Sequence, residues 1–152
     1  MKLAELLIEK KDLQEKLRQL GIQMQNNVKI QEGDESAEEP AHVLVAYQRT
    51  NSKLETVTTK INMMNNQTII ADLAISLTEA IEKREAIGRE YRFIDQTIEH
   101  AQTRTHHYFH SEIKSIVTID LKAYHALRDE LAKKMSKLDI AIQETNWQTE
   151  IN

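Results

Sequence analysis

Apolar residues recur along the chain with the alternating spacing of three and four that keeps one stripe of an α-helix facing a partner. Four segments carry this pattern, and they predict helices over residues 2–26, 38–65, 76–103 and 121–147. Amphipathic helices of similar length usually pack as an antiparallel bundle. The sequence therefore predicts an all-α fold, an antiparallel four-helix bundle.

Two of the connecting segments are more than simple turns. Residues 26–40 collect Asn, Gly, Asp, Ser and Pro, which favour turns and helix caps. Residues 105–120 contain a β-branched run that is too short for another long helix. Pairing of residues 28–30 with residues 113–116 would give a short two-stranded β-ribbon between the linkers, supported by the helices.

Candidate helix caps precede three of the predicted helices. Ser36 with Glu39 has the spacing of a capping box, and so does Ser76 with Glu79. Asp120, or Thr118 before it, is the expected cap of the last helix. These caps place the helix starts independently of the apolar stripes.

The chain also contains a weak internal repeat. A shift of 74 residues lays Leu3 on Leu77, and a shift of 81 residues lays the segment 65–70 on 146–151, which share the pattern Asn-x-Gln-Thr-x-Ile. Heptad patterns resemble one another, so a chance match between helices is the alternative explanation. The shared segment lies where the heptads stop, however, and we therefore favour a duplicated helix-loop-helix unit. The predicted repeats span residues 2–70 and 76–152 of a single helical domain, 1–152.

Composition excludes several classes of function. The 152 residues include no Cys, which removes disulfide scaffolds and thiol chemistry, and the 3 Gly stand too far apart for a phosphate-binding loop. The net charge of -4 gives no overall field for nucleic acid, and the charged amino terminus predicts neither a secretory signal nor a membrane span. We expect a cytoplasmic protein without a cofactor or a catalytic constellation.

Charged residues gather in the two linkers. If the repeat is real, both linkers lie at one end of the bundle, where paired carboxylates and ammonium groups could support acid-base chemistry or bind a ligand. Capping and turn formation are the alternative roles. The candidate residues are Lys29, Glu32, Asp34, Glu112, Lys114 and Asp120.

Three cations occupy helix positions where the heptad requires an apolar residue, namely Lys10, Arg84 and Arg128. A cation that faces the interior of a bundle must be paired, or must reach water with its charged end. Buried or half-buried salt bridges that fix the helix register are the favoured interpretation, and the partners within helical reach are Glu5, Glu9, Glu79 and Glu82. The alternative is a cationic pocket for a phosphate or carboxylate ligand.

His106, His107 and His110 are the densest group of potential metal ligands. Imidazoles three or four residues apart on a helix can share a zinc ion. The segment is a predicted loop, however, and it lacks the glutamate of the H-E-x-x-H motif. We therefore predict no metal site and a solvated polar segment instead.

Several short segments together resemble one known family. They are the start Met-Lys-Leu-Ala-Glu, Asn-Val-Lys-Ile-Gln-Glu-Gly-Asp at 27–34, Ser-Glu-Ile-Lys at 111–114 and Asn-Trp-Gln-Thr-Glu at 146–150. Over nearly its whole length the chain resembles the septicolysin-like family of small bacterial helical proteins. The resemblance implies a helical fold and no established activity, and the three histidines at 106–110 are not part of the pattern.

The pattern as a whole favours a non-enzymatic interaction or self-association module. Four apolar residues lie off the main stripes and could form the surface of a homo-oligomer, with a dimer favoured: Ile8, Ile22, Val45 and Ile140. Another protein could also be the partner. The alternative function is binding of, or catalysis on, a small anionic ligand at the linker end.

Overall fold

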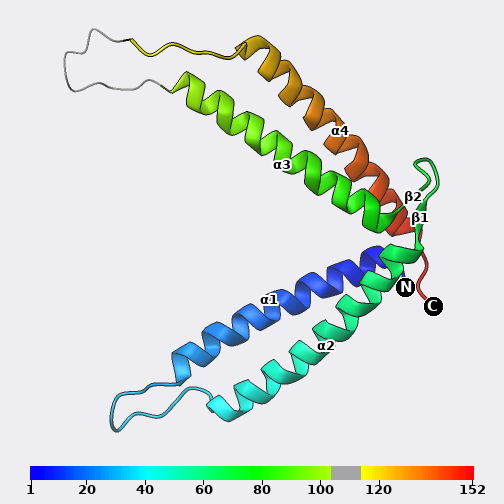
Figure 1. The fold of residues 1–152 in the computed structure, drawn as a ribbon. Coiled ribbons are helices and arrows are strands. Elements are labelled where there is room, and N and C mark those ends of the chain that lie inside the picture. Colours follow the sequence, from blue (N-terminus) through cyan, green and yellow to red (C-terminus); the bar gives the residue numbers. More distant parts are fainter. Residues whose placement is uncertain (104–113) are drawn as a thin grey trace. The chain divides into compact units, whose positions relative to one another are not determined.

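The computed structural model describes residues 1–103 and 114–152 and is dominated by four helices (Figure 1). The elements are α1 (Leu3–Asn27), α2 (Pro40–Gln67), β1 (Ile69–Ile70), β2 (Ile75–Ser76), α3 (Leu77–Gln102) and α4 (Leu121–Gln148). The predicted all-α, four-helix class is confirmed, and each helix boundary lies within two residues of its predicted position. No helix in the described ranges is long and apolar enough to span a membrane.

The chain divides into two compact units. The larger unit comprises Met1–Thr78 and Gln143–Asn152, and the smaller unit comprises Glu79–Ile142. In the larger unit α1 and α2 form a helical hairpin, because their apolar stripes pack against each other. The buried side chains of this seam include Leu6, Leu13, Leu20, Val43, Val57 and Ile61. That one domain spans 1–152 stays a prediction.

In the smaller unit α3 and α4 form the second helical hairpin. Its hydrophobic cluster is centred on Ile94, Ile98 and Leu131. Partly buried side chains surround this cluster: Ile87, Tyr91, Leu121, Tyr124 and Leu127. Two helices enclose a seam on two sides only, so much of the stripe keeps some contact with solvent.

The predicted β-ribbon between the linkers is wrong. Residues 28–30 and 114–116 form no strand, and residue 113 lies outside the described residues. Instead, β1 pairs antiparallel with β2, with Ile69 opposite Ser76. The Ile70 carbonyl oxygen accepts hydrogen bonds from the N–H groups of Leu73 (3.1 Å) and Ala74 (2.8 Å) and closes the turn. Closing this short turn costs less chain entropy than pairing two linkers that are far apart in sequence.

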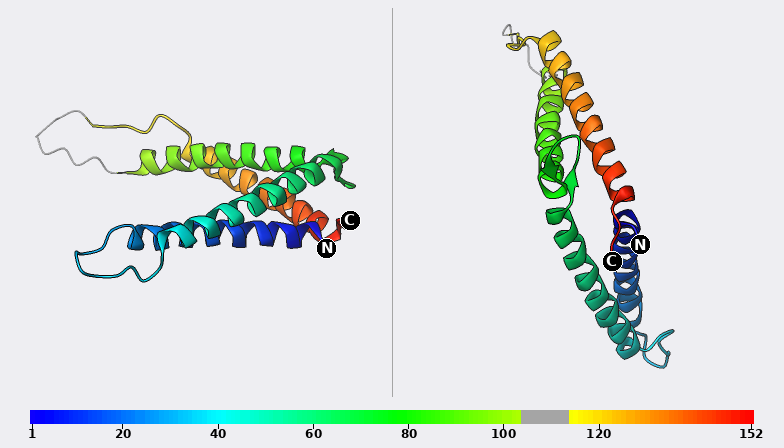
Figure 2. Two further views of the ribbon diagram at one scale, coloured as in Figure 1. Left: turned by 90° about the horizontal axis from the view of Figure 1, so that it is seen from below. Right: turned by 90° about the vertical axis from the view of Figure 1, so that its right-hand side faces the viewer.

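The two ends of the chain lie side by side (Figure 2), and a second short ladder joins them. Lys2 lies opposite Glu150 in an antiparallel bridge, and their side chains form an ion pair. The Leu3 N–H donates to the Thr149 carbonyl oxygen at 3.0 Å. Backbone pairing therefore fixes the amino terminus against the segment that follows α4.

The shifts of 74 and 81 residues relate these two ladders to each other. The Leu77 N–H donates to the Thr68 carbonyl oxygen at 2.9 Å, the counterpart of the Leu3 to Thr149 bond. Leu3 and Leu77 are both 0% exposed. Equivalent positions thus share their backbone partners and their burial, which supports the internal repeat.

Of the three predicted caps, the Asp120 cap is confirmed, the Ser36 cap is wrong, and the capping box of Ser76 with Glu79 stays a prediction. The Asp120 carboxylate accepts the Ala123 N–H at 3.2 Å, as an N-cap of α4 should. Glu39, rather than Ser36, is the N-cap residue of α2, and its side chain makes no capping bond. Pro40 takes the first helical position, which needs no N–H donor, and Ser36 donates to the Asn27 carbonyl oxygen instead (3.4 Å).

Candidate interaction site at the loop end of the first hairpin

Asn27, the last residue of α1, fixes the loop that leads to α2. Its side chain is almost fully buried, with 7% of the residue exposed. The Asn27 amide nitrogen donates to the Gln23 carbonyl oxygen (2.7 Å), and its amide oxygen accepts the Glu38 N–H (3.0 Å). These bonds hold the returning loop against the end of α1.

A solvent-open hollow of about 520 Å³ lies beside this contact. Its lining residues are Gln19, Ile22, Gln23, Asn26, Asn27, Ala37 and Glu38. Four of them carry carboxamides, which both donate and accept hydrogen bonds, and none is a cation. The hollow therefore suits a neutral polar group, such as a peptide backbone, better than an anion.

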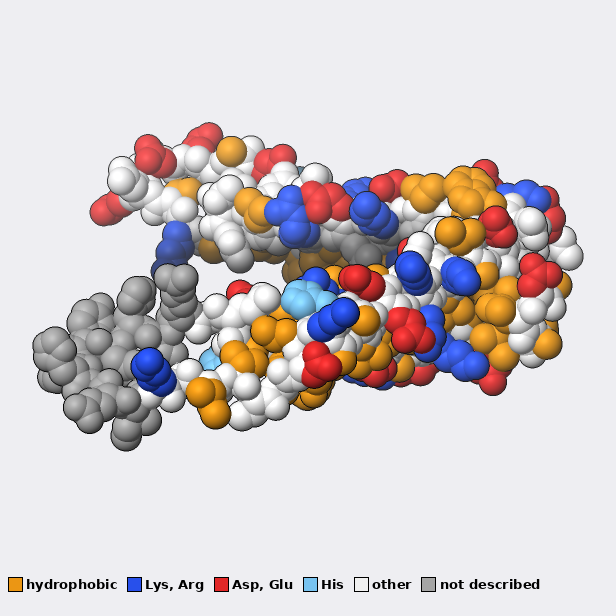
Figure 3. All heavy atoms as spheres, turned by 90° about the horizontal axis from the view of Figure 1, so that it is seen from above, with side chains coloured by type: hydrophobic (Ala, Val, Ile, Leu, Met, Phe, Trp, Pro, Cys, Tyr) orange, Lys and Arg blue, Asp and Glu red, His pale blue; other side chains and the backbone are white. Residues whose placement is uncertain are grey.

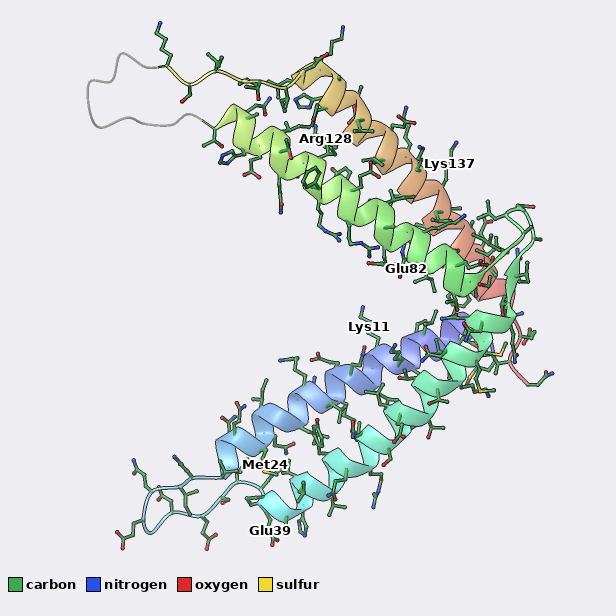
Figure 4. All side chains as sticks on the ribbon, in the orientation of Figure 1. Lys11, Met24, Glu39, Glu82, Arg128 and Lys137 are labelled. Carbon is green, nitrogen blue, oxygen red and sulfur yellow. The ribbon has the colours of Figure 1, made fainter. Side chains whose placement is uncertain are left out.

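The end of the hairpin that carries the hollow has both acidic and apolar side chains on its surface. Carboxylates gather at the end of this hairpin (Figure 3), and all five in the loop are exposed: Glu32, Asp34, Glu35, Glu38 and Glu39. Exposed apolar side chains accompany them in the last turns of α1, the loop and the first turns of α2: Ile22, Val28, Ile30, Leu44, Val45 and Tyr47. We call these two groups of residues together the loop-end surface; Met24 and Glu39 mark its position in Figure 4.

Three of the predicted linker residues belong to this region. Lys29, Glu32 and Asp34 are exposed in the loop, where the Asp34 N–H donates to the Gln31 carbonyl oxygen (3.0 Å). Gly33 supplies the positive φ of 91° that this turn requires. The loop thus has a structural account as a turn, in addition to its candidate role.

The other predicted linker residues lie elsewhere. Lys114 and Asp120 belong to the smaller unit, and Asp120 caps α4. Glu112 lies outside the described residues. Convergence of the two linkers at one end of a bundle therefore stays a prediction.

Two of the three cations in heptad positions form ion pairs between α3 and α4. Arg84 contacts Asp139 (2.8 Å between Nη1 and Oδ1), and Arg128, labelled in Figure 4, contacts Asp95 (2.9 Å). Both arginine side chains are only 27% exposed. Lys10 is half-buried in α1, and it has no ion pair among the residues that the structure describes. For the two arginines the geometry supports the salt-bridge interpretation.

His125 extends the Arg128 pair into a polar network that the sequence did not reveal. Arg128 Nη2 lies 3.1 Å from His125 Nδ1, and His125 Nε2 lies 3.3 Å from the Gln102 amide nitrogen position. A guanidinium can only donate, so His125 Nδ1 accepts the hydrogen bond from Arg128. The signal in the sequence was the spacing of three residues between His125 and Arg128, which places both side chains on one face of a helix. Both His125 and Asp95 bind the Arg128 guanidinium, so the guanidinium has a structural role in the contact between α3 and α4.

The residues that line the hollow also escaped the sequence interpretation, although their signal was present. Gln19, Gln23 and Asn26 are spaced by four and three, so they share one face of α1. The signal is a row of carboxamides on one helix face, which does not interrupt the heptad as a misplaced cation does. The four off-stripe apolar residues Ile8, Ile22, Val45 and Ile140 are all exposed, as expected.

His106, His107 and His110 lie outside the described residues. Within the described ranges, no group of three or more His, Asp or Glu side chains is arranged to hold a metal ion.

Two carboxyl groups have lowered pKa values because they lie beside cations. Hydrogen bonding from Arg18 lowers the pKa of Glu15 to about 2, and Lys2 lowers the pKa of Glu150. The Glu15 and Glu150 side chains are 49% and 61% exposed. Because neighbouring charges rather than burial cause the shifts, they indicate surface ion pairs and not a catalytic acid.

A family model described as "Family of unknown function (DUF6847)" matches residues 10–151. The chain belongs to this family. It is also similar to a solved structure, a functionally unknown conserved protein from Corynebacterium diphtheriae, with 29% sequence identity and a TM-score of 0.89. That match covers 100% of this chain and 99% of the other. No curated protein matches the chain.

Proposed function

We propose that the protein is a non-enzymatic helical interaction module whose loop-end surface binds a basic, amphipathic segment of another protein. The observation that carries this proposal is the combination of five exposed carboxylates with six exposed apolar side chains at the end of the hairpin that also carries the hollow. An exposed apolar group rimmed by charge is typical of a docking surface. The loop that forms it is held in place by buried Asn27.

Each part of the loop-end surface has a complementary part in such a partner. The carboxylates attract Lys and Arg and raise the rate of encounter. Apolar partner residues cover Ile22 and Val45, and the carboxamides of Gln23 and Asn26 pair with polar groups of the partner backbone. The acidic character of the loop excludes an acidic partner by like-charge repulsion.

The alternative function, binding of or catalysis on a small anionic ligand at the linker end, has less support in this hollow. No cation lines it, and the five neighbouring carboxylates repel an anion. Lys29 is the one basic residue of the loop. A thermal-shift screen with nucleotides and phosphorylated metabolites tests this alternative, because a ligand of the folded state must raise the melting temperature.

A synthetic helical peptide of Lys and Leu is the probe for the proposed docking. We expect this peptide to bind the full chain, and to bind less tightly as the salt concentration increases. Its affinity should be higher than that of a Glu/Leu peptide with the same pattern of apolar residues. Reversing two loop charges, Glu35→Lys with Glu38→Lys, should weaken binding by about tenfold or more, since each rim charge contributes up to about 1 kcal/mol.

Control variants distinguish binding at the loop-end surface from non-specific binding of the peptide. Val45→Ser should weaken binding, whereas Phe93→Ser, which removes a 67% exposed side chain from α3, should not. Glu90→Lys changes an exposed charge outside the loop-end surface and should leave most of the binding intact. Equal loss in control and loop variants, or equal binding of the Glu/Leu peptide, contradicts the proposal.

The predicted homodimer and the septicolysin-like resemblance remain proposals. The resemblance assigns no activity and is compatible with an interaction module. The observations that support the dimer lie at the opposite end of α1 and α2.

A further inference from the structure

The two ladders of the larger unit exchange strands between the repeats. The segment that follows α2 pairs with the segment that precedes α3, and the segment that follows α4 pairs with the segment that precedes α1. Each repeat therefore contributes its first residues to one ladder and its last residues to the other. Nothing in this pairing requires that the two repeats belong to the same chain.

We propose that the chain forms a repeat-exchanged homodimer by opening the turn between β1 and β2. In this dimer the first repeat of one copy pairs with the second repeat of the other copy, and the reverse. The Leu77 to Thr68 and Leu3 to Thr149 backbone bonds are then remade between chains, with the same donors and acceptors. The partner is a second copy of this chain, and the inference is independent of the loop-end surface.

The turn that links the repeats favours opening. It comprises residues 71–74, and Ala74 has a positive φ of 54°, a conformation that strains a residue with a Cβ. Extension of the segment in an exchanged dimer relieves this strain in both copies. Short, strained hinge loops favour exchange of equivalent elements, because the contacts are conserved and only the hinge changes.

Burial at the two ladders makes the exchange slow. Leu3 and Leu77 are 0% exposed, and Ile70 and Ile151 are 4% and 7% exposed. Both repeats must separate these side chains before they can change partners. We therefore expect the monomer and the dimer to interconvert over hours rather than seconds, and to respond little to salt, unlike a contact between charged surfaces.

The first test changes only the turn. After unfolding and refolding at high protein concentration, light scattering coupled to gel filtration should show a dimer of the wild-type chain. Ala74→Gly removes the strain from the closed form, so its dimer should dissociate at an about tenfold higher concentration or more. Ala71→Gly, the matched control, adds the same flexibility to the turn without relieving a positive φ, and should change the dimer much less.

Shortening the turn should have the opposite effect. Deletion of residues 71–74 joins β1 directly to β2, and two strands without a connecting loop cannot fold back on each other. The shortened chain should be a dimer at every concentration at which it is folded. A folded monomeric deletion variant, or an unchanged dimer in Ala74→Gly, overturns the proposal.

Cross-linking identifies the dimer directly. The chain has no native cysteine, so the double variant Lys2→Cys with Glu150→Cys places one cysteine pair across each second ladder, one pair in the monomer and two in the exchanged dimer. In an exchanged dimer each disulfide joins two chains, and the oxidised dimer fraction should stay dimeric on a denaturing gel without reductant. A dimer formed through any surface contact keeps the disulfide within each chain, and that result also overturns the proposal. Neither outcome affects peptide binding at the loop-end surface.

Discussion

Truncation of Arg84 tests how a cation is accommodated in the seam between α3 and α4. The Arg84 guanidinium lies 2.8 Å from an Asp139 oxygen, and a Glu85 oxygen lies 3.5 Å away. Asp139 is 51% exposed, so water can solvate its carboxylate when the arginine is removed. The pair is therefore expected to contribute about 0.5–1 kcal/mol, and not the 3–5 kcal/mol of a fully buried pair that loses one partner.

Packing of the Arg84 stem adds a second contribution. The side chain is only 27% exposed, so most of its methylene groups contact the seam. Arg84→Ala removes two methylene groups beyond Cβ, at about 0.8 kcal/mol for each one that is buried, and should cost about 2 kcal/mol in total. Arg84→Met keeps the stem and should cost about 0.5–1 kcal/mol, similar to Asp139→Asn.

Urea denaturation at neutral pH measures these differences, provided that the dependence on urea is the same for all variants. Arg89→Ala is the control, because Arg89 is 59% exposed in its pair with Glu82 and should cost less than about 0.5 kcal/mol. Equal losses for Arg84→Met and Arg84→Ala would refute the role of the stem. A loss of about 3 kcal/mol or more on Asp139→Asn would show that the charge is buried, contrary to this reasoning.

Three further predictions concern burial, capping and pH. Leu77→Ala should lower the free energy of unfolding by about 2–5 kcal/mol, because the side chain is 0% exposed, and chemical denaturation measures this. Asp120→Ala should cost about 0.5–2 kcal/mol and Asp120→Asn much less, since the amide can still accept the Ala123 N–H; thermal melts separate the two. The pKa of Glu150 is lowered in the folded chain by Lys2, so its contribution to stability is present above the ordinary carboxyl pKa and disappears as the pH falls through the lowered value. The stability difference between wild type and Glu150→Gln should therefore vanish in strong acid, and a difference that grows there would contradict this assignment.

The sequence by itself determined the helices of this protein. Apolar stripes and the Asp120 cap are local signals, since each depends on residues within a few turns of one another. They placed four helices to within two residues of their observed boundaries. The exposure of Ile22 and Val45 followed from the same stripes, as did the presence of charged residues in the loop after α1.

Only the tertiary structure decided which groups meet. The heptad identified Arg84 as a cation in an apolar position, but the choice of Asp139 as partner depends on the register between two helices, which periodicity does not specify. Likewise, β-branched composition suggested strands in the linkers, whereas the strands formed at residues 69–76, where a short turn brings the backbone together at low entropic cost. Asn27 became the anchor of the loop-end surface because the returning chain brought the Glu38 N–H to its amide oxygen. Helical periodicity is a property of one segment, whereas pairing between segments is fixed by the path of the whole chain.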